Sequence, residues 1–351
     1  MHEALIRAPL RFAEAPTGIR GMCLKPIIGG VREVVRRAPL RFAEAPTDGW
    51  SNVLICIIGP YDMAGLVRQG GPMTHELSTV VFGLTASLAW GAGDFSGGLA
   101  TRRANVFSVV IAAHAIGLVL LVALALAWSE PFPSALDLVW GTAAGLAGAV
   151  GLAAFYRALA VGRMGITAPV TAVLAAAVPV LFGAFAEGLP QPVQLAGFAL
   201  ALIAVGLISR SERATGRPEG LGLALLAGLG FGGFLILIGQ VSHGAIFWPL
   251  VVAGLSSSLF MLAVVLIMHQ EVLPKKEVLP LVLLAGTLDV AGNAFYVLAT
   301  HAGRLDVAAV LSSLYPAITV LLAAILLKER VTRLQAVGIL VAVVAIPLIS
   351  V

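Results

Sequence analysis

The chain has 351 residues, of which 59% are apolar and only 11% are charged, and its net charge is +4. Soluble domains carry roughly 25% charged residues, so this composition excludes an ordinary soluble enzyme. Repeated apolar runs of about 20 residues predict an all-α polytopic membrane protein, and the lack of period-2 patterns argues against a membrane β-barrel.

Residues 1–72 differ from the rest of the chain. They hold 9 of the basic and 6 of the acidic residues, and the segment RAPLRFAEAPT occurs identically at 7–17 and 37–47. Richness in Arg, Pro and Gly without lasting apolar periodicity predicts disorder. We expect a dispensable or mis-annotated N-terminal extension, with Met73 as the natural start; a basic membrane-binding arm is the alternative.

Ten membrane spans are predicted after this extension. Charged or proline-containing breaks separate them, such as Arg102-Arg103 after the first span and Glu130-Pro131 after the second. The stretch Arg210–Glu219 is the longest polar linker and lies midway. In chain order the spans are 79–100, 105–127, 138–160, 164–186, 192–209, 219–239, 245–268, 279–300, 305–327 and 334–351.

The two halves of this body resemble each other. Residues 154–156 (AFY) recur at 294–296, and the closing segments 197–209 and 338–350 align without gaps, both starting with Gly and ending in Leu-Ile-Ser. Each half has five spans, an odd number, so the copies must insert in opposite directions. The sequence therefore predicts two inverted five-helix repeats, at 73–210 and 211–351.

Basic residues predict the orientation through the positive-inside rule. The connection after the eighth span holds Arg304 alone. The opposite side holds twelve: Arg102, Arg103, Arg157, Arg163, Arg210, Arg213, Arg217, Lys275, Lys276, Lys328, Arg330 and Arg333. We expect the connections after spans one, three, five, seven and nine to be cytoplasmic; an arginine-rich 1–72 segment held inside would favour the reverse.

Several motifs resemble the drug/metabolite transporter superfamily, in particular its ten-span EamA type. They are Trp90-Gly91, the Phe-Tyr segments at 155–160 and 295–299, Pro179 before Glu187, and Tyr315-Pro316 before Glu329. The resemblance covers about 78–351 and implies secondary transport of small metabolites or drugs by alternating access. Fewer residues separate Pro179 from Glu187 than separate Pro316 from Glu329. The two halves therefore depart from a symmetric pattern at this point.

Asp289 is a candidate for the substrate or proton pathway. A charged side chain in hydrocarbon costs about 2.5–3.5 kcal/mol, so it usually faces a cavity or a partner. Asn293 and Tyr296 follow at i+4 and i+7, which places all three on one helix face. The alternative is an aspartate that only hydrogen-bonds to a neighbouring helix.

Further pathway candidates lie in other spans: Asp94, Trp90, His114, Tyr156 and Tyr315. Asp94 has glycines on both sides and serves either as a proton relay or as a partner of Arg102. His114 could titrate near neutral pH; a neutral histidine hydrogen-bonded between helices is the alternative. Trp90 either stacks on substrate or fills space.

Glu187 and Glu329 end the fourth and ninth spans, and the resemblance marks them as family glutamates. A carboxylate at a helix C-terminus opposes the macrodipole. We therefore expect a structural role, in which they pair with loop residues such as Arg330 or Arg333. Pro179 and Pro316 lie inside predicted spans and are candidate hinges, or static kinks.

The resulting prediction is a secondary active transporter, with export expected, in a bacterial-type inner membrane. Its partners are a small-molecule substrate and the lipid bilayer, without nucleic acid, cofactor or metal. The enzyme motifs HExxH, GxSxG and the P-loop do not occur in the sequence. The alternatives are an uncoupled facilitator or exchanger of the same fold, a membrane-embedded enzyme, or a scaffold.

Overall fold

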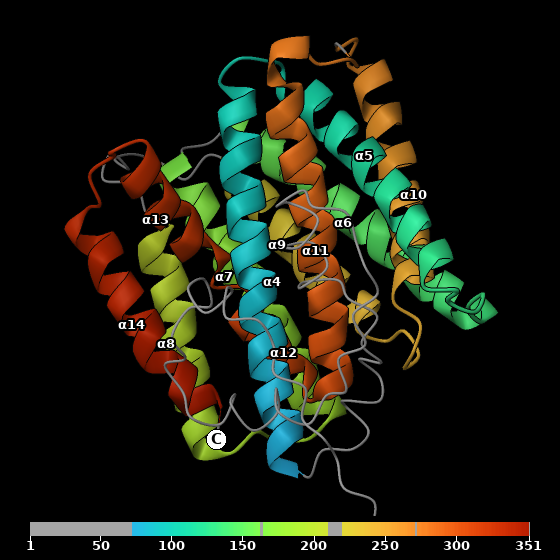
Figure 1. Ribbon diagram of the computed structural model, residues 1–351. Helices are drawn as coiled ribbons and strands as arrows, with labels where there is room; N and C mark the ends of the chain where they lie inside the picture. The colour runs from blue at the N-terminus through green and yellow to red at the C-terminus, as the bar shows by residue number, and fades with distance from the viewer. Residues whose placement is uncertain (1–71, 162–163, 210–219, 271, 351) are drawn as a thin grey trace, which may run out of the picture. The chain divides into compact units, whose positions relative to one another are not determined.

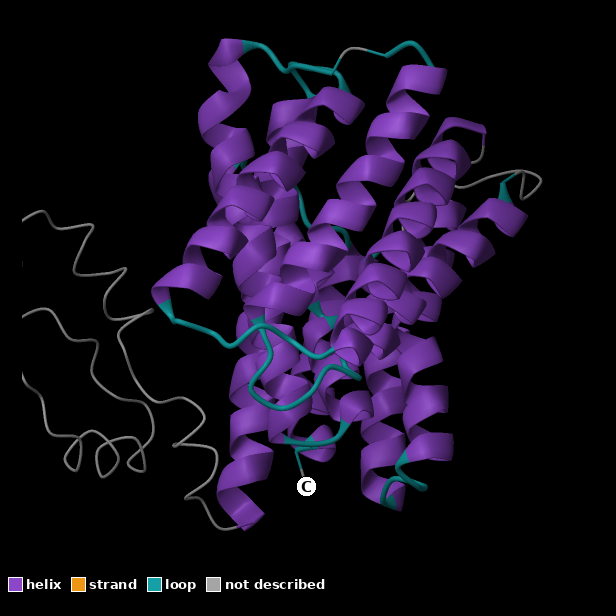
Figure 2. Ribbon diagram, turned by 90° about the vertical axis from the view of Figure 1, so that its right-hand side faces the viewer, coloured by secondary structure: helices purple, strands orange, loops and turns teal. Residues whose placement is uncertain are grey.

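The computed structural model describes residues 72–161, 164–209, 220–270 and 272–350. These residues belong to one compact unit, Asp62–Val351. All regular structure in these ranges is helical, as Figure 2 shows. The all-helical prediction is confirmed, whereas the prediction for residues 1–72 falls almost wholly outside the described residues.

The helices begin and end close to the predicted spans because prolines, glycines and charged residues interrupt the apolar runs. The main difference is the predicted span 305–327, which forms two helices. The helices are α4 (Pro72–Thr101), α5 (Val106–Ala127), α6 (Ala135–Val161), α7 (Met164–Ala186), α8 (Pro192–Ile208), α9 (Leu221–Ile238), α10 (Phe247–Ile267), α11 (Leu279–Ala302), α12 (Leu305–Ser312), α13 (Tyr315–Leu326) and α14 (Arg333–Ile349), with a 3₁₀ turn η1 (Lys276–Val278) before α11.

Six segments are long and apolar enough to cross a membrane, judged by length and composition alone. Three shorter apolar helices accompany them, and two of these, α8 and α14, have 17 residues each. A helix of this length reaches about 26 Å, slightly less than a hydrocarbon core of about 30 Å. The structure thus confirms a polytopic helical membrane protein, while the count of ten spans stays a prediction.

The helix break at Leu314 separates α12 from α13. Pro316 stands in the first turn of α13, where its missing N–H and fixed φ are tolerated, whereas in a continuous helix its ring would clash with the carbonyl of Ser312. The hydroxyls of Ser312 and Ser313 are buried and donate to backbone carbonyls one turn earlier. By contrast, α7 continues through Pro179 without interruption.

The helices pack in pairs, and in each main pair one helix comes from each of the two predicted halves (Figure 1). The helix α4 packs mainly on α11 and also on α12 and α13, and α9 packs mainly on α6 and also on α7. The helices α8 and α14 pack on each other, as do α5 and α10. The two predicted halves are therefore packed into each other along these helix pairs.

Individual contacts recur at one constant offset between the two halves. A Cβ at Gly197 would meet Ile349, and a Cβ at Gly338 would meet Ile208. Gly338 follows Gly197 by the same number of residues as Ile349 follows Ile208. The contact Gly197–Ile349 in one half therefore corresponds to the contact Gly338–Ile208 in the other.

Aromatic ring pairs obey the same offset, which relates Trp90 to Phe231 and Phe155 to Tyr296. The pair Trp90–Tyr296 has a centroid distance of 5.8 Å, and its counterpart Phe155–Phe231 has one of 6.1 Å. Tyr296 thus corresponds to Phe155, one position away from the match that the sequence suggests.

The helices α5 and α10 run antiparallel. At one end, the Glu130 carboxylate accepts the backbone N–H groups at the start of α10, including that of Phe247 at 2.8 Å. At the other end, Asn105, the N-cap of α5, donates to Gln270 at 3.0 Å. The Glu130 contacts satisfy N–H groups at the start of α10 that would otherwise lack acceptors.

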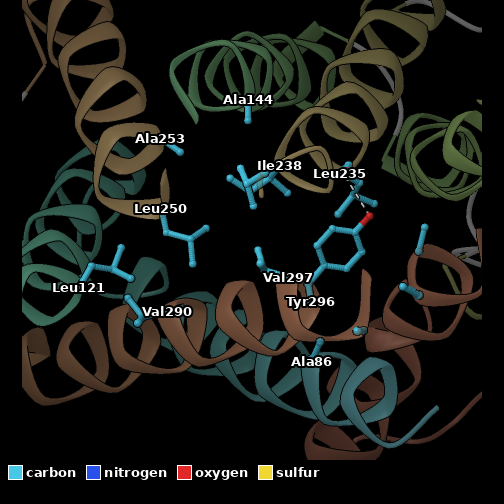
Figure 3. Packing of buried hydrophobic residues seen from close by; sticks show 14 of the residues in the cluster. Ala86, Leu121, Ala144, Leu235, Ile238, Leu250, Ala253, Val290, Tyr296 and Val297 are labelled. Atoms are coloured by element: carbon cyan, nitrogen blue, oxygen red, sulfur yellow. Dashed lines mark hydrogen bonds between the residues drawn. The ribbon is translucent and has the colours of Figure 1, made fainter. Parts of the chain in front are cut away.

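The largest buried apolar cluster joins α4, α5, α6, α9, α10, α11 and α12. Figure 3 shows its side chains converging between these helices, with Tyr296 extending from α11 toward α9. Tyr296 is fully buried, and its hydroxyl donates to the backbone carbonyl of Leu235 at 2.9 Å. This bond satisfies the phenol in the apolar core, as a buried hydroxyl requires.

Candidate functional site

The aspartate of α4 lies between two helix contacts. The backbone of Gly93 approaches Leu288 and Asp289 of α11, and that of Gly91 approaches Tyr315 of α13. At 100° per residue, Asp94 projects from the side of α4 between those two contacts. Its carboxylate therefore faces the interior between α11 and α13.

The aspartate of α11 has a comparable position. Gly286 contacts Ala113 of α5, and Gly292 contacts Trp90 of α4. Asp289 projects between these two contacts, toward the interior. The Asn293 side chain lies one turn further along the helix and donates to the Asp289 carboxylate at 3.0 Å.

Both aspartates keep solvent-accessible surface although neighbouring helices flank them. The exposed leucines of α4 and α11, such as Leu88 and Leu284, lie on other sides of these helices. The backbone N of Asp289 lies 3.7 Å from the Cβ position of Gly93, the residue before Asp94, so the two aspartates are adjacent across the α4–α11 contact. Neither forms an ion pair with any described residue, so Asp94 does not pair with Arg102.

An aromatic group borders these carboxylates. The Trp90 ring lies 5.8 Å from that of Tyr296 and 6.3 Å from that of Tyr315, the latter edge to face. The carbonyl oxygen of Tyr315 lies 2.6 Å from the Cβ position of Gly91, three residues before Asp94 on α4. The structure thus brings together six predicted residues, from α4, α11 and α13: Trp90, Asp94, Asp289, Asn293, Tyr296 and Tyr315.

Two other pathway candidates do not join this group. His114 lies on α5, and no described contact links it to either aspartate. Tyr156 belongs to α6, but its side chain lies outside the described residues.

The two family glutamates lie against basic residues outside the helices, namely Arg304 and Arg102, where the sequence prediction named Arg330 and Arg333 as examples. Glu187 accepts the backbone N–H of Leu305 at 3.2 Å, capping α12, and lies 3.9 Å from Arg304. Glu329 pairs with Arg102 at 2.9 Å. The partners are remote in sequence because helix packing, not loop proximity, brings them together. Burial raises the pKa of the Glu187 carboxyl.

Sequence reasoning did not single out Asp306, which is fully buried at the start of α12. Its carboxylate accepts hydrogen bonds from Arg304 Nε at 3.1 Å and Nη2 at 2.7 Å, which raise the pKa of the arginine. Arg304 also donates to the carbonyl of Gly188 at 2.8 Å. The signal available in the sequence was an acid in the first turn of a helix, two positions after the isolated Arg304.

A substitution at Gly91 tests the close approach of α4 to α13 beside the site. A Cβ there would lie 2.5 Å from Ile318 Cβ and 2.6 Å from the Tyr315 carbonyl oxygen. We expect Gly91→Ala to lower the free energy of unfolding by about 1–3 kcal/mol through overpacking. On the same helix, Gly98 has no heavy atom within 4 Å of its Cβ position, and Gly98→Ala should be neutral or slightly stabilising. Thermal unfolding in detergent compares the two; equal effects would contradict the predicted contact.

No group of three or more His, Cys, Asp or Glu residues in the described ranges is arranged to hold a metal ion. The site instead combines two unpaired carboxylates, an amide and aromatic rings on helices from both predicted halves. This arrangement can bind and release protons or a polar solute in the interior of the membrane.

Comparison with known proteins finds a family match over the C-terminal part of the chain. Residues 218–351 match the model of the EamA-like transporter family. No curated protein matches the sequence. Among 27 matching solved chains, a crystal structure described only as that of a protein has a TM-score of 0.63 and 20% identity, covering 78% of this chain and 96% of that one. At this identity the likeness shows the fold alone.

Proposed function

From the match of residues 218–351 to the EamA-like transporter family, we propose that the protein is a secondary active exporter of small metabolites or drugs. It works by alternating access in the inner membrane and is coupled to protons. Asp94 and Asp289 bind the coupling protons, and Trp90, Asn293 and Tyr315 contact the solute. Tyr296 holds Trp90 in place.

The observation that carries this proposal is the pair of interior aspartates with accessible surface and no counter-ion among the described residues. Ionised carboxylates are costly at this depth, and structural aspartates are normally neutralised by a partner. A proton or a cationic group is the simplest neutraliser for each carboxylate. The paired negative charges also disfavour anionic solutes.

Inverted repeats at 73–210 and 211–351 are part of the proposal. The contacts that recur at a constant offset, and the pairing of α4–α11 with α9–α6, support them. The aspartates break this symmetry, because the same offset relates Asp94 to Leu235 and Asp289 to Gly148. The proton site is therefore assigned to the α4–α11 side alone.

The orientation follows from the charges at the two ends of α4. Gly303, next to Arg304, lies against Thr79, and Arg102 is about 34 Å further along the helix axis. The Arg102–Glu329 pair stands at the end that holds the other basic residues. We assign that end to the cytoplasm under the positive-inside rule, with ten spans and the odd-numbered connections on this side.

Reconstitution of the full chain into proteoliposomes tests the function. A panel of cationic, neutral and anionic metabolites is applied under an imposed pH gradient, and a lumenal pH dye and solute flux are both recorded. We expect solute-dependent proton movement for a cationic or neutral solute. Flux without proton movement would establish an uncoupled facilitator or exchanger, and the absence of flux across the panel would contradict the proposal for these solutes.

A further inference from the structure

Gly292 lies in the middle of α11, where the indole of Trp90 from α4 rests on its backbone. A Cβ at this glycine would lie 2.5 Å from the indole Nε1 and 2.8 Å from its Cγ, and it would also meet Cδ1. Real Cβ atoms essentially never come within 3.0 Å of a neighbour, and all three atoms nearest to this position belong to Trp90. The absence of a side chain at Gly292 therefore provides the room that the indole occupies.

The contacts between α4 and α11 place both aspartates on one side of this indole. Gly93, three residues after Trp90, lies against the backbone N of Asp289, three residues before Gly292. Residue numbers thus rise along α4 while they fall along α11, so the two helices are antiparallel. Asp94 follows Trp90 by one turn, and Asp289 precedes Gly292 by about one turn. Both aspartates therefore lie in the same direction from the ring.

Tyr296 closes the opposite side of the indole. It follows Gly292 by one turn, and its ring lies 5.8 Å from that of Trp90 with 32° between the two planes. Tyr296 is fully buried and is held by its hydrogen bond to the carbonyl of Leu235. Trp90 and both aspartates, by contrast, keep accessible surface. An indole displaced from Gly292 thus has no room toward Tyr296 and moves toward the carboxylates.

The other half of the chain uses the equivalent glycine differently. The offset that relates Trp90 to Phe231 also relates Gly292 to Gly151. A Cβ at Gly151 would meet backbone atoms of α9, including the N of Phe231 at 3.0 Å, and not an aromatic ring. Gly151 therefore permits close approach of two helix backbones, whereas Gly292 accommodates a side chain. This difference occurs in the helix pair α4–α11, which holds the two aspartates.

We propose that Gly292 determines the size of the cationic group that a solute places between Trp90 and the two aspartates, a role that rests on the proposed function. The carboxylates attract an ammonium group, and an indole within about 6 Å adds a cation–π attraction. The solute is therefore an amine that is cationic at neutral pH. With the ring against the α11 backbone, the space beside the carboxylates is largest. Gly292 acts through Trp90, so it is a positioning residue.

Carbodiimide labelling of the aspartates tests the position of the ring without knowledge of the solute. The full chain in nanodiscs is treated with dicyclohexylcarbodiimide, and the adducts on Asp94 and Asp289 are quantified by mass spectrometry. We expect Gly292→Ala to reduce labelling several-fold, because the displaced indole covers the carboxylates. The matched control is Gly222→Ala, at the start of α9, where a Cβ meets no heavy atom within 4 Å; its labelling should be unchanged. Unchanged labelling in Gly292→Ala would overturn the proposal.

The double variant Gly292→Ala/Trp90→Ala separates displacement of the ring from damage to α11. Trp90→Ala removes all three atoms that the new Cβ would meet, so labelling should equal that of Trp90→Ala alone. A double variant labelled as poorly as Gly292→Ala would overturn the role of the indole. If Gly292→Ala prevents folding, the double variant is expected to recover it, and a double variant that also fails to fold would contradict the contact.

Protection of the aspartates by amines tests the size selection. Methylammonium and triethylammonium should both slow labelling of the natural chain. In Gly292→Ala the concentration of triethylammonium that gives half protection should rise roughly tenfold or more, and that of methylammonium should rise less. Equal increases for both amines would overturn the size selection, and no protection of the natural chain would overturn the cation site. A failure of all solute transport would leave these measurements intact and would contradict only the proposed function.

Discussion

Asp289→Asn is expected to leave insertion and folding intact and to reduce pH-driven transport to background. The amide has the shape of the carboxylate and still offers an oxygen to Asn293, which donates to this position at 3.0 Å. It cannot bind and release a proton, so the coupling step is lost while the helix contacts of α11 remain.

The measurement is solute-dependent proton movement in proteoliposomes, with Asp94→Asn as the partner variant. Glu277→Gln is the matched control, because Glu277 is an exposed acid just before α11 and outside the site. Transport of the control should equal that of the natural chain. Unchanged pH-driven transport in Asp289→Asn would contradict the role of this carboxylate, and loss in Asp94→Asn alone would move the role to α4.

Arg304→Met is expected to cause the largest loss of stability, about 3–5 kcal/mol, because it leaves the buried Asp306 carboxylate without its counter-ion. Asp306 has 0% of its side chain exposed and lies 2.7 Å from Arg304. The substitution also removes the bond to Gly188 that ties the end of α7 to the start of α12. The unfolding midpoint in detergent measures the effect.

Two further variants make this prediction specific. The double variant Arg304→Met/Asp306→Asn removes the unpaired charge and should recover much of the lost stability. Arg102→Met breaks the ion pair with Glu329 at the other end of α4. The side chains of Arg102 and Glu329 are 60% and 50% exposed. Exposed pairs contribute roughly 0–1 kcal/mol, so this control should change little. A loss in Arg102→Met equal to that in Arg304→Met would contradict the distinction.

The helix positions could be predicted from the amino-acid sequence alone. The segment 164–186 is α7 as predicted, and most other helices end close to the limits of their predicted spans. Such boundaries depend on local features, namely the length of apolar runs and the residues that interrupt them. The sequence also located Asp94, Asp289 and Asn293, because polar residues within apolar spans stand out by composition alone.

The choice of which helix faces meet depends instead on the packed structure. Most of these helices are apolar all round, so the sequence carries little information on the rotation of each helix about its axis. Close approach at small residues, such as Gly91 against α13 and Gly286 against α5, fixes that rotation. It directs the Tyr296 hydroxyl to Leu235 and pairs Glu187 with Arg304 instead of Arg330 or Arg333. These contacts join residues far apart in sequence, and no local pattern encodes such partners.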